Sequence, residues 1–174
     1  MSGMSRRSFL KLGACAAGGV CAGEALSEAA ASREAPDRPT ITTVLPYPRL
    51  KLANSAQLKA GVEIRLTYPD NDSPISLLKL GKKAINGIGP DSDIVAYSRL
   101  CSHMGGALDF RPDTGAFHCP LHYARFDAAK GGLTVIGQAT DNLPQIRLEV
   151  DGTGDIYAVG IMGLVYGRRA NILG

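Results

Sequence analysis

Cys101-Ser102-His103 and Cys119-Pro120-Leu121-His122 are two short motifs that each carry one cysteine and one histidine. Fifteen residues separate them, so that together they read C-x-H-x15-C-x2-H. Thiolate and neutral imidazole are both good ligands for transition metals. The sequence therefore predicts a metal centre held between two loops, one loop for each motif.

Two kinds of metal centre fit this set of ligands. In one kind of [2Fe–2S] cluster two Cys hold one iron and two His hold the other, and the imidazoles raise the reduction potential above that of a four-thiolate cluster. The alternative is a structural, tetrahedral zinc ion. Zinc fingers usually pair like ligands within a motif, whereas each motif here mixes them. Gly105 and Gly106 also follow the first motif, where they let the backbone approach sulfur closely. The pattern favours one [2Fe–2S] cluster and a role in electron transfer.

The residues around both motifs resemble the cluster-binding loops of the Rieske proteins. This resemblance rests on residues 101–106 and 119–127. Further segments resemble, more narrowly, the small Rieske subunit of bacterial arsenite oxidase, and this similarity extends over most of residues 40–174. The segments that carry it are 67–70, 89–98, 136–140, 142–144 and 163–168.

The resemblance implies a fold and a ligand set. It implies an all-β, Rieske-type domain over residues 46–174, with three stacked antiparallel sheets and a cluster-binding subdomain of two hairpin loops at one tip, about residues 96–145. Cys101 and Cys119 would bind the buried iron, and His103 and His122 the outer, redox-active iron. Residues 137–144 resemble the proline loop that covers the cluster; an ordinary surface connection is the alternative for this segment.

Four positions depart from the wider Rieske pattern. Many relatives carry a disulfide between the positions of Gly106 and Leu121, and none can form here. Many also carry hydroxyl groups, from Ser and Tyr, at the positions of Ala124 and Phe126. Because such hydroxyls stabilise the reduced cluster, the sequence predicts a lower reduction potential than in the hydroxyl-bearing, quinol-oxidising relatives.

The N-terminus has the pattern of an export signal. Residues 5–11 form a twin-arginine motif, followed by a mildly apolar run over 12–25 and a small-residue cleavage region at 29–31. We therefore expect residues 1–31 to be a twin-arginine signal segment and the protein to be periplasmic, with residues 32–45 as a linker. A membrane anchor is the alternative, but the apolar run is shorter than the roughly 20 residues of a spanning helix.

Alternation of apolar and charged residues predicts strands at 62–66 and 146–150, with the charged side chains on the solvent face. The turn residues of 151–154 predict a hairpin between the second of these strands and 156–159. Strands are also expected over 93–100 and 116–118, where they would deliver Cys101 and Cys119 to their loops.

These features suggest the electron-transfer subunit of a periplasmic arsenite oxidase, not catalytic alone. It would relay electrons from a large molybdenum-pterin subunit to a soluble cytochrome c or blue-copper protein. The alternatives are the Rieske subunit of a quinol–cytochrome complex and a Rieske ferredoxin of an oxygenase. We expect weak or no membrane association, and a net charge of +3 is too small for a nucleic-acid-binding surface.

Overall fold

The computed structural model describes residues 47–169 and 171 of the chain. The predicted signal segment, residues 1–31, and the predicted linker, residues 32–45, lie outside the described residues. Within the described part, no helix is long and apolar enough to cross a membrane.

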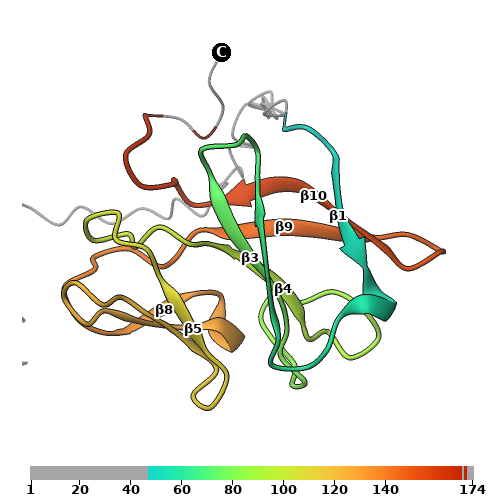
Figure 1. The fold of residues 1–174 in the computed structure, drawn as a ribbon, viewed down its shortest axis with the longest axis horizontal. Helices are drawn as coiled ribbons and strands as arrows, with labels where there is room; N and C mark the ends of the chain where they lie inside the picture. Colours follow the sequence, from blue (N-terminus) through green and yellow to red (C-terminus); the bar gives the residue numbers. More distant parts are fainter. Residues whose placement is uncertain (1–46, 170, 172–174) are drawn as a thin grey trace, which may run out of the picture. The chain divides into compact units, whose positions relative to one another are not determined.

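The described residues form ten strands and two single-turn 3-10 helices, so an all-β fold is confirmed (Figure 1). The strands predicted at 93–100, 116–118 and 146–150 are present, and the hairpin after 150 closes as expected. The elements are β1 (Leu50–Asn54), η1 (Ser55–Gln57), β2 (Glu63–Thr67), β3 (Pro74–Lys79), β4 (Ile94–Ser98), β5 (Asp109–Arg111), β6 (Ala116–His118), β7 (Arg125–Asp127), η2 (Ala128–Lys130), β8 (Leu133–Ile136), β9 (Gln145–Val150) and β10 (Asp155–Met162).

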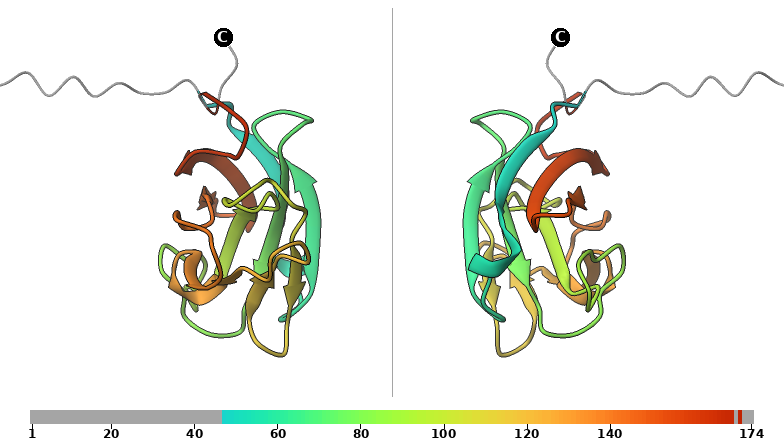
Figure 2. Two further views of the ribbon diagram at one scale, coloured as in Figure 1. Left: turned by 90° about the vertical axis from the view of Figure 1, so that its left-hand side faces the viewer. Right: turned by 90° about the vertical axis from the view of Figure 1, so that its right-hand side faces the viewer.

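Six strands form the larger sheet, in the order β1-β10-β9-β4-β3-β2. Every one of them contributes apolar side chains to a single core, so the sheet curls around that core, as the side views show (Figure 2). Representative members, one for each strand in chain order, are Leu52, Leu66, Ile75, Ile94, Ile146 and Ile156.

The smaller sheet, in the order β5-β6-β7-β8, packs against the outer face of the larger one. Val95 and Tyr97 of β4 join Phe117 of β6 and Phe126 of β7 in a second core. Since the alternate residues of β4 lie in the first core, this strand is buried on both faces, which explains its unbroken apolar sequence. The Tyr97 hydroxyl donates a hydrogen bond to the Ala128 carbonyl oxygen at 2.8 Å, which satisfies its buried polar atom.

Two details differ from the sequence-based expectations. The described strands form two hydrogen-bonded sheets rather than three, because β4 pairs with β9 at Ala96 and Ile146 and so joins what would be separate sheets. Glu63, expected on the solvent face, has a side chain only 13% exposed; it accepts a short hydrogen bond from Ser76 and lies 3.3 Å from the Arg99 guanidinium. An internal ion pair therefore overrides the simple alternation at the start of β2.

Candidate metal centre

Each motif lies in a loop with the same backbone hydrogen bonds. In the first ligand loop, residues 101–106, the Cys101 N–H donates to the Gly106 carbonyl oxygen at 2.9 Å, and the Gly105 N–H returns to the Cys101 oxygen at 2.8 Å. In the second ligand loop, residues 119–124, Cys119 bonds Ala124 at 2.8 Å and Tyr123 bonds Cys119 at 3.0 Å in the same two directions. Two copies of one turn therefore present the two cysteines.

The fifth residue of each ligand loop is in the left-handed backbone region. Gly105 has φ +70° and Tyr123 has φ +60°. This conformation suits glycine but is uncommon for a tyrosine, so the second loop carries a conformational cost that the first avoids. The strained residue lies directly after His122, where it sets the direction of the chain beside the candidate ligand.

The four candidate ligands lie as two pairs. Cys101 and Cys119 are free thiols, 1% and 3% exposed, in the core between the sheets. Burial raises the pKa of the Cys101 thiol, the His103 N–H acts in the opposite direction, and the neighbouring Cys119 raises it further. The rings of His103 and His122 face each other edge to face, with centroids 4.9 Å apart, at or near the surface.

This arrangement fits a two-iron cluster better than a single ion. A single structural zinc ion would need all four ligands around one point. A buried thiol pair and an outer imidazole pair instead match a cluster with sulfur ligands on one iron and nitrogen ligands on the other. The side chains present could therefore hold a [2Fe–2S] cluster.

Gly106, the last residue of the first ligand loop, packs closely against the second ligand loop because it has no side chain. A Cβ added there would lie 3.1 Å from the Cys119 sulfur and 2.7 Å from Leu121 Cδ1. Gly106 and Leu121 thus face each other across the two loops, as expected for the positions that carry the disulfide in many relatives. Here the Leu121 side chain packs on the Gly106 backbone and replaces a covalent link by a van der Waals contact.

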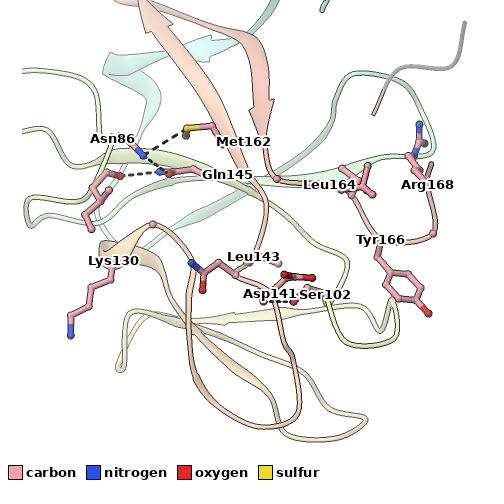
Figure 3. Close-up of a pocket in the computed structure, with 16 residues that line it drawn as sticks. Asn86, Ser102, Lys130, Asp141, Leu143, Gln145, Met162, Leu164, Tyr166 and Arg168 are labelled. Carbon is pink, nitrogen blue, oxygen red and sulfur yellow. Dashed lines mark hydrogen bonds between the residues drawn. The ribbon is translucent and has the colours of Figure 1, made fainter. Parts of the chain in front are cut away.

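A third segment, residues 137–144, contacts both ligand loops. The Ser102 hydroxyl donates to the Asp141 carbonyl oxygen at 2.7 Å (Figure 3), and a Cβ on Gly137 would lie 2.5 Å from Ala124 Cα. The Ser98 N–H also donates to the Pro144 oxygen at 2.9 Å. The segment therefore packs as the proline-loop prediction requires, and is more than a surface connection.

Other residues singled out in the sequence have clear positions. Ala124 and Phe126 are fully buried in the core that contains Cys101 and Cys119. His118 lies on β6, outside both ligand loops, with a ring nitrogen 3.4 Å from the Thr114 hydroxyl. Ser102 was not singled out from the sequence, although a hydroxyl between two candidate ligands is a usable signal for a loop-fixing residue.

Residues 49–147, a range that includes both motifs, match the Rieske [2Fe–2S] domain family. The chain belongs to this family. A [2Fe–2S] cluster is accordingly its cofactor. The Rieske-type fold predicted from the sequence is confirmed by the crystal structure of the soluble domain of Rieske protein II from Sulfolobus acidocaldarius, which matches with a TM-score of 0.63 and 26% identity. That match covers 71% of this chain and 83% of the other.

Two of the curated relatives are named as subunits of iodate reductase. The iodate reductase subunit IdrB of Denitromonas iodatirespirans is 44% identical over 131 residues, which cover 74% of this chain and 70% of that protein. The subunit of the same name from Pseudomonas sp. (strain SCT) is 45% identical over 124 residues, which cover 70% of this chain and 64% of that protein. Because both are named for iodate reductase, the narrower resemblance to arsenite oxidase stays a prediction.

Proposed function

We propose that Cys101, His103, Cys119 and His122 bind the [2Fe–2S] cluster and that the chain is the electron-transfer subunit of a molybdenum-pterin oxidoreductase. The observation that carries the proposal is the pairing of two buried thiols with two outer imidazoles in matched loops. When bound, the cluster supplies reversible one-electron transfer. The protein fixes the four ligands and excludes water from the sulfur side.

The histidine side of the site is the proposed point of electron exchange. Met104, Leu121 and Tyr123 are 57%, 56% and 76% exposed in the same loops, so an apolar surface surrounds the two imidazoles. With one ring nitrogen on iron, each histidine keeps its second nitrogen free to donate a hydrogen bond to a partner or to water.

Two substrates are candidates for the proposed catalytic partner, arsenite and iodate. The segments that resemble the arsenite oxidase small subunit support arsenite, with electrons leaving through this chain to a cytochrome c or blue-copper acceptor. The names of the two relatives support iodate, with electrons entering through this chain. The two possibilities require opposite directions of electron flow, and that difference makes them separable.

Purification of the chain with its partner from the periplasmic fraction tests the proposal. We expect iron and molybdenum in the complex and an anisotropic electron paramagnetic resonance signal after dithionite. Arsenite should reduce the oxidised cluster if arsenite is the substrate, and iodate should reoxidise the reduced cluster if iodate is. Zinc in place of iron, or a colourless protein with no signal, would overturn the cluster assignment.

Substitution of single ligands tests the site itself. Cys119→Ser should abolish the cluster signal because it removes one of only two sulfur ligands. The neighbouring His118→Gln is the matched control, since His118 lies on β6 outside the ligand loops, and it should keep the signal.

Export by the twin-arginine route is part of the same proposal. It rests on residues 5–11, and it fits a protein that receives its cluster before it crosses the membrane. Replacement of Arg6 and Arg7 by Lys should leave the cluster-bearing chain in the cytoplasm, whereas Lys11→Arg should not change its location.

A further inference from the structure

The chain after β10 forms a segment that is tied down at several points. We call residues 163–169 and 171 the C-terminal brace. The Arg168 guanidinium makes two hydrogen bonds to the Asp70 carboxylate, at 2.5 and 2.8 Å, and its side chain is only 11% exposed. Val165 is buried, and its N–H donates to the Asn171 side-chain oxygen at 2.8 Å. The Arg168–Asp70 pair holds the brace against the turn between β2 and β3, and the Val165–Asn171 hydrogen bond ties the brace to itself.

The Asn171 amide closes the brace on itself. Its nitrogen donates to the Gly163 carbonyl oxygen at 2.7 Å and to the Tyr47 hydroxyl at 3.1 Å. The Asn171 side chain thus ties residue 171 to the start of the brace at Gly163. A segment fixed in this way can hold a side chain in one place without help from a regular strand or helix.

The brace places the Tyr166 side chain next to the candidate metal centre. Tyr166 and Arg168 leave the brace in opposite directions (Figure 3). The Tyr166 ring lies on the backbone of Gly105, where an added Cβ would be 2.4 Å from Cδ1 and 2.6 Å from Cε1. The contact is with the residue whose N–H closes the first ligand loop onto Cys101.

We propose that Tyr166 is a positioning residue for the first ligand loop. The brace then restrains this loop in place of the disulfide that many relatives carry. The inference rests on the proposed ligand roles of Cys101 and His103. The first loop is held at Ser102 by the hydrogen bond to Asp141 and at Gly105 by the Tyr166 ring. His103 and Met104 lie between these two supports.

The physical basis is the closed turn of the first loop. To open, the loop must break the Gly105–Cys101 hydrogen bond and move the Gly105 backbone outward, and the aromatic ring occupies the space into which Gly105 would move. Because the Leu121–Gly106 contact between the loops is not covalent, this outer support decides how often the loop opens. The ring, not the Tyr166 hydroxyl, provides the support.

The test uses the full-length chain with its cluster and three substitutions. Tyr166→Ala removes the ring, Tyr166→Phe keeps the ring and removes the hydroxyl, and Leu164→Ala truncates an exposed side chain of the same brace. Hydrogen exchange of the peptide that contains residues 101–106, the rate of iron release to a chelator, and the anisotropy of the reduced cluster signal are measured for each.

We expect Tyr166→Ala to speed exchange and iron release by about tenfold and to broaden the cluster signal, because the ring no longer blocks the outward movement of Gly105 and a change of about 1.4 kcal/mol in the opening equilibrium is tenfold. Tyr166→Phe and Leu164→Ala should match the wild type. If Tyr166→Ala does not fold, two milder variants replace it: Tyr166→Leu, and Arg168→Met, which removes the contact of the brace with Asp70. Both should show the same changes with a smaller size.

The result distinguishes this inference from the proposed function. A wild-type protein without the cluster signal overturns the ligand assignment. A wild-type protein with the signal, combined with ring-deleted variants that exchange and release iron at the wild-type rate, overturns the role of Tyr166 and leaves the ligand assignment intact. A Tyr166→Phe variant as impaired as Tyr166→Ala also overturns it, because the hydroxyl would then be the active part.

Discussion

At the scale of single residues, we expect two buried side chains to influence the reduction potential of the cluster. Ala124 and Phe126 lie fully buried beside the two cysteines and bring no hydrogen-bond donor. We expect Ala124→Ser and Phe126→Tyr each to raise the reduction potential, because a hydroxyl donor stabilises the reduced cluster by about 1 kcal/mol, or roughly 40 mV for one electron. Protein-film voltammetry measures the shift.

Phe110→Tyr is the control for that prediction. Phe110 packs on Phe117 with ring centroids 5.3 Å apart, on β5 and outside the ligand loops. Its added hydroxyl should leave the potential unchanged. A shift in this variant equal to those at 124 and 126, or no upward shift at either of those positions, would contradict the hydrogen-bond explanation.

Gly106 is required for reasons of space. We expect Gly106→Ala to lower the iron content at least severalfold, because the new methyl group would lie 3.1 Å from the Cys119 sulfur and 2.7 Å from Leu121. Iron analysis and visible absorption of the purified variant measure the loss. Gly152→Ala is the matched control: a Cβ there meets nothing within 4 Å, so full iron content is expected, and a normal cluster in Gly106→Ala would disprove the steric argument.

At the scale of elements, the sequence predicts structure formed by residues that are close in the chain. It does not predict contacts between residues that are far apart in the chain. The ligand loops close within six residues, so their motifs are visible in the sequence, and β4 and β9 carry clear apolar patterns. Strands β5 and β7 have only three residues each, too few for a pattern to show. The brace depends on a pair 98 residues apart, Asp70 and Arg168, which no single segment reveals.

The Asp70–Arg168 pair gives the brace a pH dependence. The Arg168 guanidinium lowers the pKa of the Asp70 carboxyl below its usual 3.8, so the pair stabilises the fold fully above pH 3.8 and is lost as the pH falls through the lowered pKa. Asp70→Asn should cost about 1 kcal/mol near neutral pH, since the carboxylate is partly exposed and screened.

Urea unfolding of the wild type and Asp70→Asn, at neutral pH and below pH 3.8, measures this contribution. The difference in free energy of unfolding between the two proteins should shrink as the pH falls, because both then lack the charge at position 70. Asp72→Asn, at an exposed position of the same turn, is the control and should follow the wild type. A difference that stays constant with pH would argue against the ion pair.

At the scale of the whole molecule, the two loops that carry the histidines hold no Asp, Glu, Lys or Arg. Residues 100–108 and 119–124 contain no Asp, Glu, Lys or Arg, and Asp141 is the one charged residue of the covering segment 137–144, while Met104, Leu121 and Tyr123 expose apolar surface there. Charged residues at the rim of an interface speed protein association and make its rate sensitive to salt. Binding through these loops should therefore depend on apolar contact instead. The sequence could show which residues lack charge, but only the fold shows that the three segments meet at one tip.

The rate of electron exchange with the partner should therefore vary little with ionic strength. We expect a change of less than about threefold when salt shortens the Debye length from roughly 10 Å to roughly 3 Å, measured by stopped-flow reoxidation of the reduced cluster. Gln138→Lys places a charge on the exposed surface of the covering segment and should make the rate clearly salt-dependent. A steep salt dependence of the wild type would place the contact elsewhere, because a single carboxylate at this tip is too little charge to produce it.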